Sequence, residues 1–319
     1  MKQRLIDLLA VFEKENIEKS FPLDYCLPVY HCVSDENLPH LNHIIQYKNA
    51  RQFENDLDYF SRYFQFLNWN EFKDFLNGNF KPQKRIALLT FDDGFREFYD
   101  VVLPILERKG IYAINFINPA FIDNKDLMFR CKASLIVDRI KTSASRNVEI
   151  NIEQVLKINY KNKDQLDQIA EKLEVDFDSY LKDQRPYMNI DQLKNLKEKG
   201  FGISAHSWDH PLYGELSLED QLKNTIKSLN FTKENDFLHD GFAFPFTDFG
   251  VRKDFFENLF KNEQLSYSFG CAGIKLDSFE KNLQRIPMET GETASNTVKK
   301  EIAYFTFKKL WNKNTIIRK

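Results

Sequence analysis

Short apolar runs alternate with longer helical patterns along the chain, and this alternation is the strongest constraint on its fold. The apolar runs have the length of buried parallel strands and lie at residues 27–33, 86–91, 112–117, 202–206, 242–246, 267–270 and 284–288. The helical patterns lie at residues 50–64, 96–108, 190–199, 217–230 and 251–261. Repeated strand–helix units predict a mostly parallel sheet. We therefore expect an α/β fold, a distorted (β/α) barrel of about seven parallel strands with a helical insertion.

The same alternation predicts the domain organisation. Two helical patterns end at a glycine directly before an apolar run, at Gly110 and Gly200, where a left-handed C-cap is expected. The 319 residues, 42% of them apolar, are enough to bury one barrel-sized core. We predict one domain over residues 1–319, with an N-terminal helical extension at 1–24 and a polar helical insertion at about 125–185. The insertion is either a lid that frames substrate or an excursion without a functional role.

Charge and cysteine content exclude several classes of protein. The 45 Lys and Arg residues nearly balance the 47 Asp and Glu residues. The formal net charge of -2 therefore gives no footprint for nucleic acid or for electrostatic docking on anionic lipid. The four cysteines form no CxxC pair, which argues against a structural zinc site and a thioredoxin-like redox site. We interpret them as free thiols.

The first residues do not have the pattern of a secretory signal. Asp7 and Glu13 interrupt the only apolar patch, and no small-residue cleavage site follows it. No run in the sequence approaches the roughly 20 apolar residues of a membrane span. We therefore expect a cytoplasmic protein without stable membrane insertion, and we leave peripheral contact with the inner membrane face open. The sequence does not indicate an oligomeric state.

Chemistry-bearing residues begin where the second apolar run ends. The sequence IALLTFDDGF passes from apolar residues to Asp92, Asp93 and Gly94. Adjacent carboxylates repel each other unless a cation or a shared proton relieves the repulsion, so this pair indicates a ligand at the end of a strand. The alternative is a structural role in which Asp92 caps the following helix while Asp93 and Gly94 form a turn.

A second polar motif, HSWDHP, closes the apolar run at 202–206 and places His206 and His210 four residues apart. With one carboxylate, two imidazoles at this spacing can form a metal site that leaves positions open for water and substrate. The alternative is two surface histidines satisfied by ordinary hydrogen bonds. Because the active groups of a barrel gather at the carboxyl ends of its strands, the two motifs together favour a metal site.

The motifs TFDDG at 90–94 and HSWDH at 206–210 resemble the first two signature motifs of the polysaccharide deacetylases. This family is also called the chitooligosaccharide-deacetylase homology family and carbohydrate esterase family 4. The resemblance runs from about residue 25 to about residue 290. It implies a distorted (β/α) barrel and the hydrolysis of N-acetyl groups on amino sugars, here those of a surface glycan or its biosynthetic precursor.

The resemblance also implies a role for each motif residue. Asp92 would be the general base, and Asp93, His206 and His210 would bind a divalent metal ion. Zinc is the first candidate, and cobalt, nickel or iron suit the same ligands. Attack of metal-bound water on the acetamide carbonyl would then release acetate and a free amine.

The third motif departs from the main family pattern. FAFPFTDFG at 242–250 resembles the third motif of a subgroup with an FAxPF-type run. Ala243 stands where the larger subgroup has an arginine, and Thr247 stands where a glycine is usual. We therefore expect the base to be oriented differently. In the family a backbone N–H after the proline helps to hold the oxyanion, and this role would fall to Phe246.

The last motif departs further. LQRIPME at 283–289 resembles the final strand motif of the same subgroup, but the histidine that many members use as general acid is missing. We predict that His31 replaces it, because it ends the first strand, and the first and last strands of a barrel are neighbours. The alternative is a hydrogen-bonded histidine without a catalytic role. Arg130 and Arg285 are further candidates, either for supporting the residues that act on substrate or for binding substrate themselves, with surface or packing roles as the alternative.

Two other functions are compatible with these residues. A glycan-binding protein that has lost turnover would explain the altered third and last motifs. A hydrolase of a non-sugar amide would share the metal site. The intact Asp92 favours the deacetylase, because a protein without turnover has no need of an unligated acid at this position.

Overall fold

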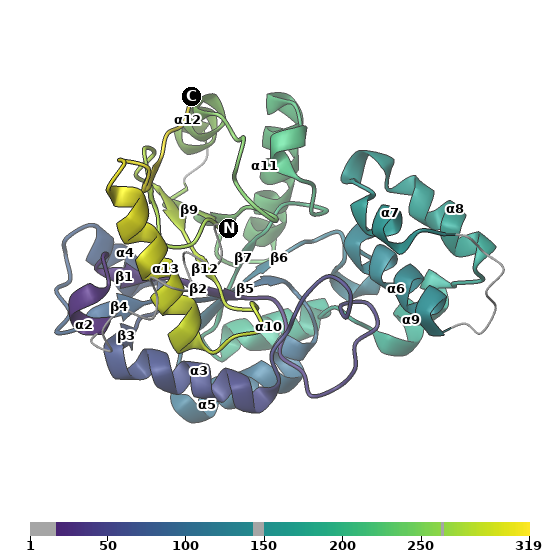
Figure 1. Ribbon diagram of the computed structural model, residues 1–319, viewed down its shortest axis with the longest axis horizontal. Helices are drawn as coiled ribbons and strands as arrows, with labels where there is room; N and C mark the ends of the chain where they lie inside the picture. The colour runs from purple at the N-terminus through teal and green to yellow at the C-terminus, as the bar shows by residue number, and fades with distance from the viewer. Residues whose placement is uncertain (1–16, 143–149, 263–264) are drawn as a thin grey trace.

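The computed structural model describes residues 17–142, 150–262 and 265–319, and it shows the predicted α/β barrel (Figure 1). Within these residues, eight strands form one parallel sheet in the order β11-β9-β8-β7-β6-β5-β2-β12. In chain order they are β2 (Pro28–Tyr30), β5 (Leu89–Asp93), β6 (Ala113–Ile117), β7 (Gly202–Ala205), β8 (Gly241–Ala243), β9 (Tyr267–Gly270), β11 (Asn282–Gln284) and β12 (Ile286–Pro287).

The sheet closes through its last segment. β11 pairs with β9 and β12 pairs with β2, and only Arg285 separates β11 from β12. The backbone N–H of Arg285 donates to the carbonyl of Gly270 on one side, and that of Ile286 donates to Leu27 on the other. The segment 282–287 therefore fills one position in the ring, so the eight elements occupy seven positions. The prediction of about seven parallel strands is confirmed.

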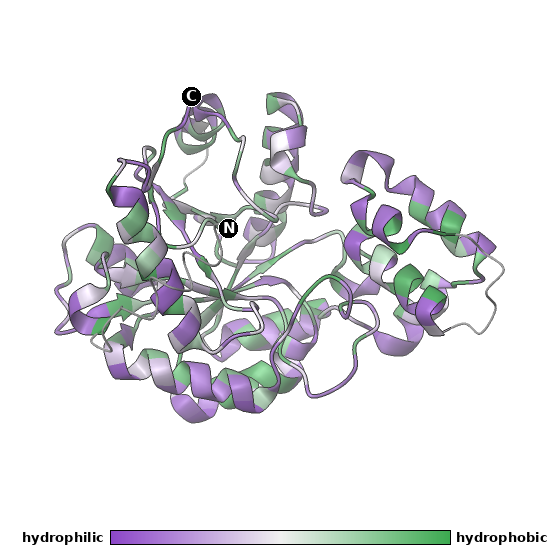
Figure 2. Cartoon of the chain, viewed as in Figure 1, coloured by the Kyte–Doolittle hydropathy of each residue, from purple (hydrophilic) through white to green (hydrophobic). Residues whose placement is uncertain are grey.

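Helices cover the outside of the barrel, with hydrophilic outer faces over mainly hydrophobic strands (Figure 2). They are α3 (Ala50–Tyr63), α5 (Leu103–Lys109), α10 (Ile190–Glu198), α11 (Leu218–Glu234), α12 (Lys253–Asn262) and α13 (Ala294–Lys309). Gly110 and Gly200 have φ angles of 63° and 89°, which confirms the predicted left-handed helix ends. The pattern at 96–108 begins as a π-helix, η1 (Phe98–Val102), before α5. Pro104 near that junction has no N–H for a regular helical bond.

Shorter elements complete the barrel domain. They are α2 (Ile17–Ser20), β1 (Tyr25–Cys26), β3 (Phe64–Phe66), α4 (Trp69–Leu76), β4 (Arg85–Ala87), η2 (Ile122–Asn124), η4 (Tyr213–Glu215), β10 (Leu276–Asp277) and β13 (Thr315–Ile316). The apolar run at 86–91 is divided at Leu88, contrary to expectation. β4 joins a separate sheet with β1 and β3, whereas β5 enters the barrel and extends to Asp93.

The helical insertion lies beside the barrel, between β6 and β7 (Figure 1). It contains α6 (Phe129–Thr142), α7 (Ile152–Lys157), η3 (Tyr160–Asn162), α8 (Asp164–Lys172) and α9 (Phe177–Gln184). These helices share a hydrophobic cluster with the loop that follows β2. Of the predicted N-terminal extension, residues 1–16 lie outside the described residues. None of the helices within the described ranges has the length and apolar content needed to cross a bilayer.

Aromatic side chains fill the inside of the barrel below its carboxyl end. The rings of Phe116 on β6 and Phe269 on β9 lie 5.4 Å apart between centroids, and both are fully buried. The guanidinium of Arg285 lies 5.5 Å from the Phe116 ring. The polar groups at this end of the barrel therefore rest on an apolar floor, where unpaired charges are costly.

Candidate metal and catalytic site

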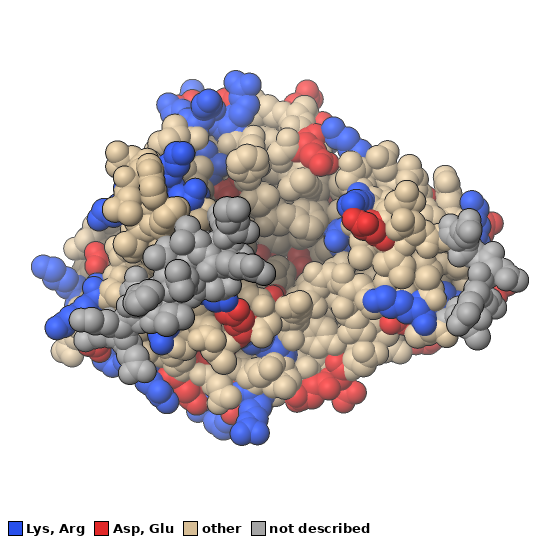
Figure 3. Space-filling view, viewed as in Figure 1, with Lys and Arg blue, Asp and Glu red and all other residues tan. Residues whose placement is uncertain are grey.

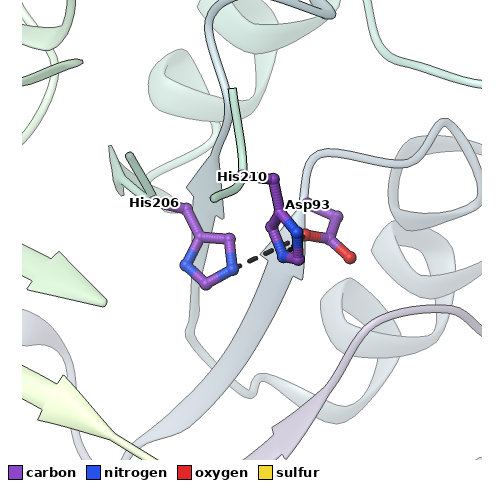
Figure 4. Close-up of side chains that lie close together, drawn as sticks. All are labelled: Asp93, His206 and His210. Carbon is purple, nitrogen blue, oxygen red and sulfur yellow. Dashed lines mark ion pairs between the residues drawn. The ribbon is translucent and has the colours of Figure 1, made fainter. Parts of the chain in front are cut away.

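The two polar motifs meet at the carboxyl end of the barrel. Asp92 and Asp93 are the last two residues of β5, so the alternative in which Asp92 caps a helix is wrong. His206 directly follows β7, which is separated from β5 in the sheet by β6 alone. Figure 4 shows the side chains of Asp93, His206 and His210 pointing toward one another.

These three side chains form a compact group. Nε2 of His210 lies 3.2 Å from Oδ1 of Asp93, and Nε2 of His206 lies 3.5 Å from the same oxygen. One ligand atom from each residue lies within 4.8 Å of the other two. All three residues are buried. The alternative of two surface histidines is therefore wrong, and the group has the donor set of a two-histidine, one-carboxylate metal site.

The chemistry of the three residues fits a divalent metal ion. Oδ1 of Asp93 and Nε2 of His206 are buried and have no hydrogen-bond partner among the described residues, which is costly unless another group binds them. Nδ1 of His206 donates to the carbonyl of Ala243 at 2.9 Å, so Nε2 keeps its lone pair for a ligand. Burial lowers the pKa of His206 to about 4, which keeps this imidazole neutral near neutral pH, as metal binding requires.

The backbone around the triad adopts an uncommon conformation. Asp93, Ser207, His210 and Phe246 have φ angles of 74°, 70°, 61° and 55°, in the left-handed region that residues other than glycine rarely adopt. Hydrogen bonds hold the histidine loop in place, because Asn118 donates to the carbonyls of His206 and Ser207. Strained backbone of this kind is typical of functional sites, where the surrounding structure maintains it.

Asp92 lies beside the triad but has a different partner. Its two carboxylate oxygens accept hydrogen bonds from Nη1 and Nη2 of Arg285 at 2.6 and 2.7 Å. Burial raises the pKa of Asp92, but Arg285 together with His206 and His31 lowers it by more, so the carboxylate remains ionised. The Arg285 side chain is 0% exposed. Of the roles that the sequence left open for Arg285, support of another site residue is the one observed: Arg285 is the buried counter-ion of Asp92, and it lies neither at the surface nor open to substrate.

His31 lies at the end of β2 and is paired with Glu289. Its Nδ1 lies 2.5 Å from one carboxylate oxygen of Glu289, and the other oxygen accepts backbone N–H groups from His31 and Cys32. Burial lowers the pKa of His31, but Glu289, with smaller contributions from Asp93 and Asp92, raises it by more, to about 9. The side chain of His31 keeps 28% exposure, so a protonated imidazole remains accessible. Sequence reasoning singles out the stretch 283–289 but misses Glu289 as a functional residue.

The other candidate residues have different surroundings. The Phe246 ring packs edge-on against His210, with centroids 4.3 Å apart, and is 41% exposed beside the triad. Arg130 lies on α6, and its guanidinium donates to the carbonyl of Leu156 within the insertion. His40 is buried and bonds Tyr180 of the insertion, so His31 is better placed than His40 to act in the site.

The insertion contacts the loop that carries the two histidines. The hydroxyl of Tyr160 lies 2.5 Å from Oδ2 of Asp209, and Asn224 on α11 donates to the other oxygen of Asp209 at 2.8 Å. Figure 3 shows a hollow between the barrel and the insertion, with Asp and Glu side chains at its floor. The insertion therefore forms one side of this hollow.

Comparisons with known proteins agree with this architecture. Residues 79–234 match the polysaccharide deacetylase family. No curated protein matches the chain in sequence. The deacetylase PplD of Streptococcus pyogenes, solved in complex with acetate, is similar in structure, with a TM-score of 0.58, 16% identity, and 87% of this chain and 97% of that chain covered. IcaB of Ammonifex degensii is also similar, with a TM-score of 0.56, 16% identity and coverages of 88% and 97%. A de-N-acetylase of Aggregatibacter actinomycetemcomitans gives a TM-score of 0.56 at 14% identity, with coverages of 86% and 99%.

Proposed function

The chain carries a polysaccharide deacetylase domain, and on this premise we propose that it is a metal-dependent hydrolase that removes N-acetyl groups from amino sugars of a surface glycan or its precursor. One observation carries the proposal: Asp93, His206 and His210 converge on one point, while both carboxylate oxygens of the neighbouring Asp92 accept hydrogen bonds from Arg285. A single strand end thus supplies one carboxylate to a metal ion and a second to proton transfer.

Asp93, His206 and His210 would hold the metal ion, for which we propose zinc. When bound, a divalent ion lowers the pKa of water and polarises the substrate carbonyl. The neutral state of His206 and the ionised state of Asp93 suit this role. Burial raises the pKa of Asp93, but His210, together with His31 and His206, lowers it by more, to well below its usual range.

The remaining steps are assigned to residues of this chain. Asp92 accepts a proton from the attacking water, whose oxygen forms a bond to the acetamide carbonyl carbon. His31, protonated through its pairing with Glu289, donates a proton to the amide nitrogen as the C–N bond breaks. The products are acetate and a free amine. Phe246 offers its backbone N–H to the developing oxyanion.

In this proposal, two of the three departures from the family pattern, Ala243 and the missing histidine, have a counterpart elsewhere in the chain. Arg285 supplies the cation that Ala243 cannot supply, and His31 supplies an acid in place of the missing histidine. The Arg285–Asp92 and His31–Glu289 pairs support an enzyme over a glycan-binding protein without turnover, because a protein that only binds glycans would need neither pair.

Acetate release tests the proposed function. We expect the purified protein to release acetate from at least one member of a panel of N-acetylated oligosaccharides, nucleotide sugars and lipid-linked glycans. Chelation should abolish release and lower the Tm, because an ion that binds only the folded state stabilises it, and zinc should restore both. Release that continues after the metal is removed, or release from simple non-sugar acetamides only, would contradict the proposal.

The His31–Glu289 pair gives a separate prediction. We expect His31→Ala to lower kcat for N-acetyl sugars by roughly 10²–10⁴-fold with little change in KM, because proton donation to the amine is lost. Glu289→Gln should move the alkaline limb of the kcat profile to lower pH. Its carboxylate raises the pKa of His31 to about 9, so without it the acid loses its proton earlier as the pH rises.

A leaving group that needs no proton distinguishes catalysis from structure. Hydrolysis of p-nitrophenyl acetate should fall far less in His31→Ala than hydrolysis of the N-acetyl sugar. His239→Ala, which changes a histidine whose ring bonds a nearby backbone carbonyl, is the matched control and should leave both rates unchanged. Equal losses on both substrates in His31→Ala would show that His31 does not act as the acid.

A further inference from the structure

The near-neutral total charge, from which no docking on anionic lipid is expected, conceals a strongly basic segment. Residues 302–319 contain five Lys and Arg residues and no Asp or Glu. Three of the five, Lys308, Lys309 and Lys313, lie at the end of α13 and in the turn that follows it. Local excess of this kind, rather than net charge, governs the attraction of a protein to an anionic surface.

The same segment exposes large apolar side chains. Leu310 is 74% exposed, Trp311 is 55% exposed and Ile317 is 68% exposed. On the loop after β8, Phe249 is 83% exposed, more than any other large apolar residue among the described residues. Apolar side chains exposed together in a soluble fold usually mark a surface that contacts another body.

Hydrogen bonds and ion pairs hold the last residues of this segment against the loop after β8. The guanidinium of Arg318 is buried and binds Asp248 and Asp277, and its Nη1 donates to the carbonyls of Asp248 and Val251. The N–H of Lys253 donates to the carbonyl of Lys319. Ile317 and Phe249 consequently line one cleft. We call Phe249, Leu310, Trp311 and Ile317, with the basic residues around them, the C-terminal patch.

Basic side chains surround the exposed apolar ones. Arg252, Lys275 and Lys319 line the same cleft as Phe249 and Ile317. Figure 3 shows Lys and Arg side chains gathered along the edge of the molecule near the chain end marked C in Figure 1, with few Asp and Glu side chains among them. The carboxylates of Asp248 and Asp277 on this side are both committed to Arg318. Arg252 is paired with Asp254 at 3.5 Å, so the positive charge available to a partner comes mainly from the lysines of the segment and from Lys275.

From this combination we propose that the C-terminal patch docks the protein onto the surface of an anionic lipid bilayer. Trp311, Leu310, Ile317 and Phe249 enter the boundary between headgroups and acyl chains, where tryptophan is preferred. The lysines pair with lipid phosphates, and the attraction is lost at high salt. No spanning helix is needed for this mode of binding.

The patch also approaches the candidate active site. Phe249 lies three residues after Phe246, which packs against His210, so the Cα atoms of the two phenylalanines are no more than about 11 Å apart. Docking would therefore bring the metal site close to the bilayer and favour glycans that are held at its surface by a lipid. The docking itself does not depend on the proposed deacetylase activity.

Vesicle binding tests the proposal with the full chain. We expect the protein to sediment with vesicles of an equimolar mixture of phosphatidylcholine and phosphatidylglycerol, and not with phosphatidylcholine alone. Trp311 emission should shift to the blue on binding. Partitioning should fall at least about tenfold in K308E/K309E/K313E and in L310S/W311S. In both cases the Tm should stay close to that of the unaltered protein, because four of the five side chains are exposed and Lys308 is half-buried.

A charge-matched variant gives the control. K172E/K182E/K194E reverses three exposed lysines outside the patch and should bind the vesicles like the unaltered protein. Absence of sedimentation at low salt, or equal loss in the control, would overturn the proposal. A dimer seen by analytical ultracentrifugation and lost in L310S/W311S would overturn it in favour of an interface between two copies. None of these outcomes requires acetate release, so failure of the docking and failure of the proposed activity are distinguishable.

Discussion

Asp92→Asn is expected to lower kcat for N-acetyl hydrolysis by roughly 10²–10⁴-fold while metal binding is kept. The amide has nearly the shape of the carboxylate and can still accept one hydrogen bond from Arg285, but it cannot take a proton from water. Asp92 is outside the triad and its oxygens face the guanidinium at 2.6 and 2.7 Å, so the metal ligands should not move. The measurement is kcat for acetate release, with bound metal determined on the same sample.

The neighbouring residue gives a matched variant. Asp93→Asn removes the same charge one residue later, but from the side chain that lies 3.2 Å from His210 and 3.5 Å from His206. We expect this variant to lose both the bound metal and the rise in Tm that the metal produces, in addition to its activity. If Asp92→Asn lost metal as Asp93→Asn does, or if Asp92→Asn kept full activity, the division of roles between the two carboxylates would be wrong.

The parts of the site that sequence predicts are those encoded by local patterns. Asp92 and Asp93 stand at the end of one apolar strand pattern, and His206 stands at the end of another. Because the carboxyl ends of parallel strands meet on one face of a barrel, these polar side chains are expected to lie together. The fold follows from the same alternation. The triad geometry then needs only that β5 and β7 lie near each other, which they do across β6.

Long-range pairs are not encoded in this way. Arg285 is 193 residues from Asp92, and Glu289 is 258 residues from His31. No hydrophobic periodicity and no adjacent motif in the sequence indicates which residue Arg285 or Glu289 will contact. The absence of arginine at Ala243 is a clue, because a buried Asp92 then needs another cation. Arg285 can be identified as that cation only when the segment 282–287 is known to close the ring between β9 and β2.

The boundary between β4 and β5 is a feature of the fold that hydropathy does not reveal. The run 86–91 is apolar except for Thr90, yet it contributes to two sheets. The N–H of Leu88 donates to the carbonyl of Cys26 in β1 of the small sheet, whereas Leu89 begins the barrel strand. A buried residue in either sheet has the same preference for apolar side chains. The hydropathy pattern therefore predicts correctly that these residues are buried, but it cannot show that they belong to two strands in two different sheets.

Arg285→Met is expected to be the most destabilising change in the site. Methionine fills much of the volume of arginine but leaves the Asp92 carboxylate buried on an apolar floor without its counter-ion, and breaking a buried ion pair from one side costs about 3–5 kcal/mol. The pKa of Asp92 should rise, because burial raises it and Arg285 is the largest opposing cause. The free energy of unfolding, measured with urea, gives the first check.

The pH dependence of that loss identifies its cause. In the unaltered protein the pKa of Asp92 lies below its usual value of 3.8, so its contribution to stability is present above that value and is lost as the pH falls through the lowered pKa. In Arg285→Met the sign reverses, because a raised pKa makes the folded state bind a proton more readily than the unfolded chain. The difference in unfolding free energy between the two proteins should therefore be largest near neutral pH and shrink toward acid pH.

Two further variants separate this electrostatic effect from lost packing. Asp92→Asn combined with Arg285→Met removes both charges and should regain part of the stability that Arg285→Met loses, since no unpaired charge remains. Arg318→Met removes another buried arginine, the partner of Asp248 and Asp277, and should lower the stability of the protein. Asp92→Asn should change the free energy of unfolding by the same amount in Arg318→Met as in the unaltered protein. If the double variant were no more stable than Arg285→Met, the loss would come from the cavity around residue 285. The counter-ion role assigned to Arg285 would then fail, because relief of the charge on Asp92 would have had no effect.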